Sequence, residues 1–208
     1  MANEGVGSVL TVRVGVFFAA LVPFGLLLSQ TLVGDLGPDP AKELSLETGE
    51  WAMRFLLLAL AMTPLRHLTG RLEFAQRRRM IGLFALFYAS LHFLVWVAFL
   101  LGFRLGAVVE EVIERPYITL GFAAFLILLV LGITSPRSMV RRLGRQWRRL
   151  HRLVYVSGVL AVAHLVWIVR TDLVEAVVYG GILAGLLLWR VYFARKTAQK
   201  RPVPAFKN

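Results

Sequence analysis

MIGLFALFYASLHFLVWVAFLL at residues 80–101 and LHRLVYVSGVLAVAHLVWIV at residues 150–169 are the two stretches that decide the fold. Each is a mainly apolar run of about 20 residues, the length that a helix needs to cross a bilayer. Each also holds one histidine well inside the run, His92 in the first and His164 in the second. An ionisable side chain at membrane depth is costly and usually marks a functional site.

The rest of the chain is similarly apolar. Its 208 residues are 58% hydrophobic with a mean hydropathy of +0.69, more than a soluble core needs. The predicted membrane spans cover residues 14–33, 51–68, 80–101, 117–134, 150–169 and 176–194. We therefore predict an all-α polytopic membrane protein. A six-helix transmembrane bundle over residues 14–194 would follow a cytoplasmic segment at 1–13 and precede a flexible basic cytoplasmic tail at 195–208.

The charges between the spans predict how the bundle is oriented. The segment 34–50 is acidic, whereas the segments 69–79 and 135–149 are rich in arginine. Basic and non-basic connections alternate along the whole chain, and by the positive-inside rule this pattern places both termini in the cytoplasm. The net charge of +12 therefore belongs to cytoplasmic loops. Nucleic-acid binding is not expected, because it needs basic residues on one face of a soluble domain.

Composition also limits the redox chemistry. The chain has no cysteine, which excludes disulfides, cysteine-ligated iron–sulfur clusters and the covalent attachment of a c-type haem. No loop is long enough to form a nucleotide-binding domain of its own, and neither a G-x-G-x-x-G motif nor a P-loop is present. We detect no internal repeat. Any haem in this chain must be held non-covalently.

His92 and His164 are predicted to lie at the same depth in the membrane. They lie about 18 Å and 21 Å from the cytoplasmic ends of their spans, at 1.5 Å of rise per residue, and both spans run in the same direction. Facing imidazoles at this level could hold a planar haem between the helices. The alternatives are that each histidine is hydrogen-bonded across helices as a buried polar group or lies on a proton pathway. The matched pair favours a metal or a haem.

Other polar residues occupy the ends of the spans. His151 lies about 20 Å along the helix axis from His164, so it cannot bind the same iron. It is a candidate ligand of a second haem, for which His67 has the matching depth; alternatively, His67 is part of the basic loop. Arg54 either extends to the membrane surface or pairs with a haem propionate, since its fork of donors suits carboxylates.

A resemblance to a known family is carried by four stretches between residues 49 and 167. They are GEWAMRFLLLALAMTPLRHL, RRRMIGLFALFYASLHFLVW, ERPYITLGF and TSPRSMVRRLGRQWRRLHRLVYVSGVLAVAHLVW. In these stretches the chain resembles the MsrQ (formerly YedZ) family of ferric-reductase-like transmembrane proteins, which are b-type cytochromes of the bacterial inner membrane. The resemblance implies that His92, His151 and His164 are haem iron ligands, with His92 and His164 as the axial pair. His67 falls where arginine is expected in the family, so no role is carried onto it.

The resemblance also implies cofactors and partners. Family members bind haem b, with a flavin such as FMN also associated, and take electrons from the quinone pool. They pass these electrons to a periplasmic molybdopterin-containing catalytic subunit, MsrP, which reduces methionine sulfoxide in envelope proteins. The chain is thus expected to be the electron-transfer subunit of such a system, in contact with membrane lipid. The basic cytoplasmic loops, including Arg77 to Arg79, are the expected flavin site.

Three other functions stay open. A stand-alone quinol–ferric reductase would reduce ferric chelates without a partner. A proton-coupled small transporter would use the histidines in a proton path and bind no haem, although the predicted spans lack an Asp or Glu at membrane depth. A scaffold for other membrane proteins would tolerate replacement of its histidines.

Overall fold

The computed structural model describes residues 2–168 and 173–199, and the side chains of all of these except residues 2–10 and 198. Over these ranges the chain is helical and contains no strand, so the prediction of an all-α fold is confirmed. The helices are α1 (Ala2–Val33), α2 (Pro40–Thr69), α3 (Glu73–Val95), the π-helix η1 (Trp96–Leu100), α4 (Leu105–Glu114), α5 (Pro116–Ile133), α6 (Arg137–Leu143), α7 (Arg145–Leu150), α8 (Leu153–Ile168) and α9 (Val174–Gln199).

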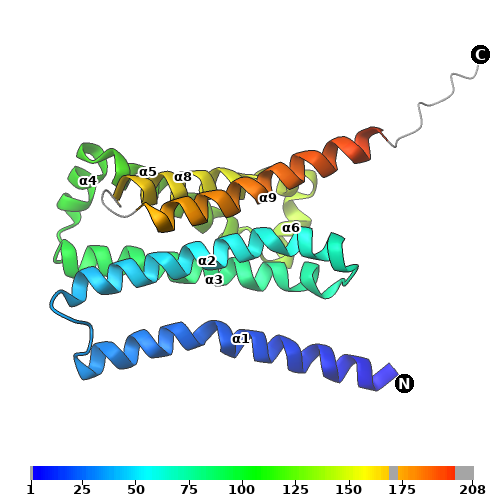
Figure 1. The fold of residues 1–208 in the computed structure, drawn as a ribbon, viewed down its shortest axis with the longest axis horizontal. Coiled ribbons are helices and arrows are strands. Elements are labelled where there is room, and N and C mark those ends of the chain that lie inside the picture. The colour runs from blue at the N-terminus through cyan, green and yellow to red at the C-terminus, as the bar shows by residue number, and fades with distance from the viewer. Residues whose placement is uncertain (1, 169–172, 200–208) are drawn as a thin grey trace, which may run out of the picture.

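The long helices run lengthwise beside one another, and short helices lie across the two ends of the bundle (Figure 1). Helix α4 lies at one end, and α6 lies at the other end together with the turn between α2 and α3. The first described turn of α1 and the last described turn of α9 also lie at the α6 end. The basic segments and both described ends of the chain therefore share one end of the bundle.

Five helical segments in the described part of the chain are long and apolar enough to cross a membrane. They are Thr11–Val33, Glu73–Leu100, Pro116–Ile133, Arg145–Ile168 and Val174–Thr197. The sixth span predicted at 51–68 lies in α2, which is not among the five because its apolar stretch is short and interrupted by charged residues.

Helix α2 is nevertheless the centre of the bundle. Leu56 and Leu60 are only 2% and 1% exposed, and in Figure 1 α2 lies between α1 and α9 and runs along α3. A helix that is enclosed by other helices contacts little lipid, so it satisfies its polar groups within the protein and needs a shorter apolar stretch.

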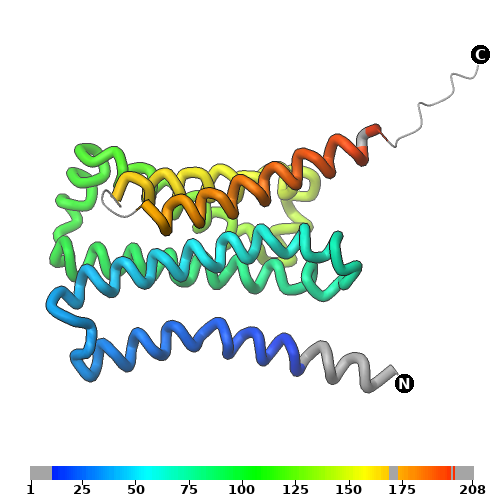
Figure 2. The backbone as a smooth tube through the Cα atoms, viewed as in Figure 1, coloured from blue at the N-terminus to red at the C-terminus, as the bar shows by residue number. Residues whose placement is uncertain are grey.

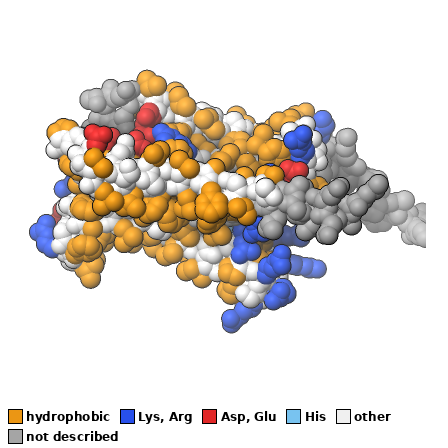
Figure 3. Space-filling view, turned by 90° about the horizontal axis from the view of Figure 1, so that it is seen from below, with side chains coloured by type: hydrophobic (Ala, Val, Ile, Leu, Met, Phe, Trp, Pro, Cys, Tyr) orange, Lys and Arg blue, Asp and Glu red, His pale blue; other side chains and the backbone are white. Residues whose placement is uncertain are grey.

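The outer surface of the bundle is strongly apolar. Large side chains such as Phe18, Leu188 and Val177 are more than half exposed, and in Figure 3 hydrophobic side chains cover a broad zone between the two ends. Arginine and lysine side chains gather toward one end of the same view. An exposed apolar zone of this extent is what a lipid-facing surface requires.

A tyrosine joins α1 to this core. Tyr88 is fully buried and stacks on Phe55, with ring centroids 5.2 Å apart. Its hydroxyl donates to the Ala20 carbonyl (2.8 Å) and accepts from the Phe24 N–H (3.1 Å). These two backbone groups would bond to each other in an uninterrupted helix. The inserted hydroxyl, next to Pro23, explains the bend in the middle of α1 that Figure 2 shows.

Several helices extend past the predicted spans. Helix α1 begins at Ala2, inside the segment predicted at 1–13, and α3 begins at Glu73. Helix α9 continues to Gln199, inside the tail predicted at 195–208, of which residues 200–208 lie outside the described part of the chain. Helix α4 forms in a connection for which no helix was predicted. Apolar runs mark only the lipid-facing part of a helix, since polar residues continue the helix into the interface.

Candidate functional site

His92 on α3 and His164 on α8 lie opposite each other inside the bundle, with their rings edge to face. Their ring centroids are 6.3 Å apart and their planes meet at 79°. Two imidazoles that share one metal ion need centroids about 6 Å apart, because each metal–nitrogen bond is about 2 Å long and the nitrogen lies about 1 Å from the ring centre. The structure thus brings the two predicted histidines to the separation that a shared metal requires.

Each imidazole is held by one backbone carbonyl from the neighbouring helix. His92 Nδ1 lies 2.8 Å from the Ser45 carbonyl oxygen on α2, and His164 Nδ1 lies 2.6 Å from the Tyr117 carbonyl oxygen on α5. A carbonyl can only accept, so Nδ1 of each ring must be the donor. This fixes the tautomer and leaves each Nε2 with a free lone pair, the form in which histidine binds metals.

Glycines let these rings lie close to the neighbouring helices. A methyl group on Gly49 would lie 3.0 Å from Nδ1 of His92, and a methyl group on Gly121 would lie 2.8 Å from Nδ1 and Cε1 of His164. The contact at Gly121 is shorter than real Cβ atoms show, so the His164 ring would have to move, and the contact at Gly49 is tight enough that the His92 ring would have to give way slightly. Gly49 and Gly121 are therefore part of the site.

The two halves of the site repeat each other. Ser45 and His92 are 47 residues apart, as are Tyr117 and His164. Each glycine follows the residue whose carbonyl accepts from the histidine by one helical turn. The difference in residue number between Ser45 and Tyr117 equals that between His92 and His164. The helix pair α2–α3 and the helix pair α5–α8 are thus equivalent units that each supply one histidine.

The packing between the two units follows the same relation. Leu60 of α2 lies against Gly158 of α8, and Leu86 of α3 lies against Gly132 of α5. Leu60 and Gly132 differ in residue number by the same amount as the two histidines, and so do Leu86 and Gly158. Each of the two contacts is therefore the equivalent of the other in the opposite unit. Such self-complementary contacts are those of a two-fold arrangement. The histidines face each other across this pseudo-two-fold axis.

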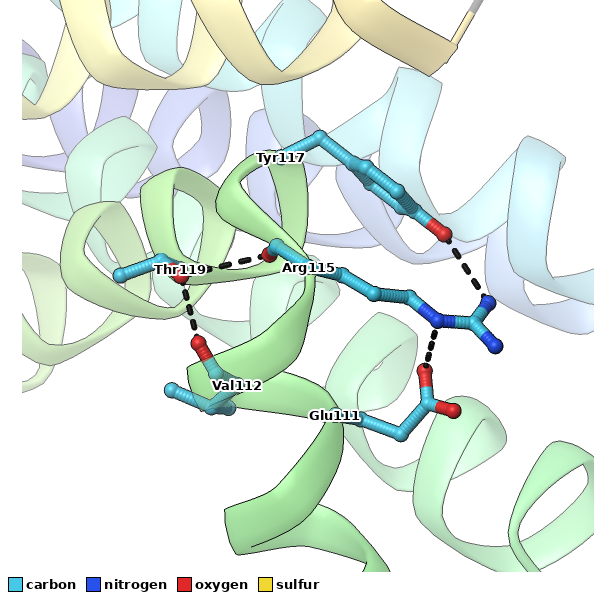
Figure 4. Close-up of polar contacts among 5 residues, drawn as sticks. All are labelled: Glu111, Val112, Arg115, Tyr117 and Thr119. Atoms are coloured by element: carbon cyan, nitrogen blue, oxygen red, sulfur yellow. Dashed lines mark hydrogen bonds and ion pairs between the residues drawn. The ribbon is translucent and has the colours of Figure 1, made fainter.

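The corner between α4 and α5 positions the carbonyl that holds His164. Arg115 donates to Glu111 (2.9 Å) and to the Tyr117 hydroxyl (3.1 Å), and Thr119 donates to the Val112 and Arg115 carbonyls (Figure 4). The bond to Tyr117 raises the pKa of Arg115 above its ordinary value, so the guanidinium stays charged. The first turn of α5, with the Tyr117 carbonyl, is thereby tied to α4.

The donor set fits a haem better than a bare metal ion. In the described part of the chain no three His, Asp or Glu side chains come together as a metal site. Two opposed imidazoles supply only the axial ligands of an octahedral metal, so four equatorial ligands must come from elsewhere. A porphyrin supplies four nitrogens in the plane between two axial histidines.

In the described part of the chain, the rings of His151 and His67 contact neither the His92–His164 pair nor each other. The His151 ring stacks on Trp147 at 3.9 Å, with Nδ1 3.2 Å from the Trp147 carbonyl. The His67 ring lies against Trp189 and Phe193 of α9. The expectation of His67 as partner of His151 therefore gains no support from these contacts.

Arg54 is engaged within the chain. It forms an ion pair with Glu50, donates from Nε to the Tyr179 hydroxyl at 3.0 Å and lies over the Trp51 ring. Its side chain is 37% exposed, in keeping with the prediction that it extends toward the surface.

Sequence reasoning found the histidines but missed Ser45, Gly49, Tyr117 and Gly121. A backbone carbonyl leaves no mark on residue type, so Ser45 and Tyr117 could not be recognised individually. The equal spacing from each glycine to its histidine was available as a signal, because both separations can be read from the sequence.

Comparisons with known proteins identify the family of the chain. Residues 48–162 match the family described as ferric reductase like transmembrane component, a range that includes His92 and His151 and ends just before His164. The chain is similar to the protein-methionine-sulfoxide reductase heme-binding subunit MsrQ of Xanthomonas euvesicatoria pv. vesicatoria, at 47% identity over 95% of this chain and 94% of the relative. It is 43% identical to the MsrQ of Herminiimonas arsenicoxydans, over 88% of this chain and 86% of that protein. No solved structure matches the chain significantly.

We predict opposite effects of alanine at two glycines. Gly121→Ala should lower the free energy of unfolding by about 1–3 kcal/mol, because the new methyl overlaps the His164 ring. Gly181→Ala on α9, where no atom lies within 4 Å of the added methyl, should be neutral or stabilise by up to about 1 kcal/mol through higher helix propensity. Reversible unfolding in mixed micelles of mild detergent and dodecyl sulfate measures both.

Measuring Gly121→Ala in a protein that already carries His164→Ala identifies the cause of the destabilisation. With the ring removed, Gly121→Ala should lose most of its destabilising effect, as a double-mutant cycle would report. An unchanged effect of Gly121→Ala in that background would show that the imidazole is not what the glycine accommodates.

Proposed function

The chain belongs to the MsrQ family of heme-binding subunits of protein-methionine-sulfoxide reductase, and from this premise we propose that it is a haem b electron-transfer subunit of the bacterial inner membrane. The observation that carries the proposal is the pair His92 and His164, with free Nε2 atoms and a ring separation of 6.3 Å. A haem iron held by two protein ligands has no open position, so it exchanges single electrons rather than binding a substrate.

The residues around the pair have separate roles in this proposal. His92 and His164 are the axial ligands, and the Ser45 and Tyr117 carbonyls orient them and raise their basicity as ligands. His151 is the candidate ligand for a second haem near the basic end. Its Nδ1 also lies next to a carbonyl, that of Trp147.

We further propose the route of the electrons. They come from the quinone pool, with FMN bound at the basic loops as an additional carrier. They leave to a periplasmic MsrP-like molybdopterin subunit that repairs methionine sulfoxide in proteins. The gradient of charge along the bundle supports this direction, because His92 and His164 lie toward the end that carries α4 and its glutamates. The chain is thus not the catalytic subunit of the system.

The match to the ferric-reductase-like family favours a second candidate, a stand-alone quinol–ferric reductase with the same haem. It differs in needing no partner protein. Reduction of a soluble ferric chelate by quinol, with the purified chain as the only protein, separates this candidate from the subunit role.

The proposed topology has six spans, with α2 as the sixth, and both termini in the cytoplasm. Because the chain has no cysteine, single cysteines report on sidedness without background. In spheroplasts, an impermeant maleimide should label Asp35→Cys before α2 and Glu110→Cys on α4 directly, but Arg71→Cys after α2, Arg141→Cys and Lys196→Cys only after permeabilisation. Labelling of Asp35→Cys and Arg71→Cys from the same side would show that α2 does not cross the membrane.

The haem proposal predicts a b-type spectrum with a defined mutational pattern. The dithionite-reduced minus oxidised spectrum of the detergent-purified protein should show haem b, and His92→Ala and His164→Ala should each abolish the signal of the shared haem, since one imidazole cannot replace the other. His67→Ala is the matched control and should leave the signal unchanged. Haem-free, folded wild-type protein from haem-sufficient cells would contradict the proposal and favour the transporter.

A further inference from the structure

A groove near the basic end of the bundle is not used by the histidine pair. It has a volume of about 590 Å³ and lies between α2, α8 and α9, lined among others by Thr63, His67, Tyr155 and Arg190. Its α9 residues fall in the last turns of the apolar segment Val174–Thr197. The groove is therefore at the boundary between the apolar zone and the basic end, where a lipid-soluble molecule can enter from the side.

Aromatic rings form one wall of this groove. The Trp189 and Phe193 rings on α9 are 4.2 Å apart, and the His67 ring of α2 lies 5.4 Å from Trp189. Among the described residues neither ring nitrogen of His67 has a hydrogen bond. A planar ring could stack on this wall and receive a hydrogen bond from the imidazole.

Arg190 forms the polar part of the groove, and a helix break explains its position. Pro64 has no N–H, so the Leu60 carbonyl one turn earlier in α2 lacks its helical donor. Arg190 Nη2 donates to this carbonyl at 2.7 Å, and Nη1 donates to the Tyr155 hydroxyl at 2.8 Å. The guanidinium is thus held rigidly at membrane depth by two neutral oxygens.

The positive charge of Arg190 has no counter-ion in the described part of the chain. Its Nε is buried and has no hydrogen-bond partner in the described part of the chain, and no carboxylate there pairs with the guanidinium. The Nε atom is enclosed by protein, but Nη1 and Nη2 each carry a second N–H besides the one already used. A ligand oxygen in the groove can accept from these and offset the uncompensated charge.

We propose that this groove binds the ring of a quinone or quinol, with the ring stacked on the Trp189–Phe193 wall and its oxygens accepting from Arg190 and His67. The inference rests on the proposed function, for which it supplies the electron entry site. A neutral, planar, lipid-soluble ring with oxygen acceptors matches all three features of the groove: an aromatic wall, a cationic guanidinium without a carboxylate partner, and lateral access.

The location also suits electron entry. Tyr155 lines the groove one helical turn beyond His151, so the groove is next to the candidate ligand of the second haem. Oxidation of a quinol here yields the quinone, two protons that leave to the aqueous phase at the basic end, and two electrons that pass singly to haem iron in the chain.

The test uses the full chain in quinone-free nanodiscs and decylubiquinone as the probe. Arg190→Gln and Trp189→Leu should each weaken decylubiquinone binding at least tenfold, whereas Tyr192→Leu, an exposed aromatic on the same helix, should not. A photoreactive azidoquinone should crosslink to residues of α2 and α9 in the groove, and decylubiquinone should compete with it.

Two results would overturn the inference: wild-type affinity for decylubiquinone in both groove variants, or loss of FMN binding rather than quinone binding in both. The dithionite-reduced spectrum of the same samples keeps the two proposals apart. A normal haem spectrum with unaltered quinone binding rejects only the groove. Quinone binding that depends on Arg190 and Trp189 in a chain without haem rejects only the electron-transfer function.

Discussion

The hydrogen bond from each histidine Nδ1 to a backbone carbonyl is the constraint on which the site depends. It selects one tautomer for His92 and for His164, fixes both ring planes and leaves both Nε2 atoms with a free lone pair. For the bond to form, an imidazole must lie against a neighbouring helix, and this is possible only where that helix carries a glycine. The carbonyl, the glycine and the histidine therefore form one unit, which the bundle contains twice.

Polar groups within the apolar zone follow a related rule, since a membrane offers them no water. The Tyr88 hydroxyl satisfies two backbone groups at the bend of α1, and Arg190 satisfies the carbonyl that Pro64 leaves without a donor. Ser157, which is fully buried, donates to the Ala124 carbonyl. Helix breaks in this protein are thus compensated by side chains from other helices, and among the buried side-chain nitrogens and oxygens of the described residues only the Nε of Arg190 lacks a hydrogen bond.

Length and hydropathy predicted the helical class and most of the membrane spans, and counting residues along the spans was enough to place His92 and His164 at one level. Because α3 and α8 belong to the same bundle and the two histidines lie at one level, their rings come close together. Helix α2 was harder, because the central helix is shielded by protein and has the least apolar sequence. The internal repeat escaped detection for a physical reason. Its equivalent positions conserve spacing rather than residue type, as Leu60 and Gly132 do, since a large residue on one side requires a small one on the other.

The central claim is that His92 and His164 share one iron with ring planes held nearly perpendicular by their carbonyl partners. Electron paramagnetic resonance of the oxidised protein at low temperature tests this directly. Two axial imidazoles at 79° should give a low-spin ferric signal with strongly anisotropic g values, and both His92→Ala and His164→Ala should remove it. A high-spin, five-coordinate ferric signal in the wild-type protein, or a low-spin signal that persists when either histidine is replaced, would contradict the shared-iron site.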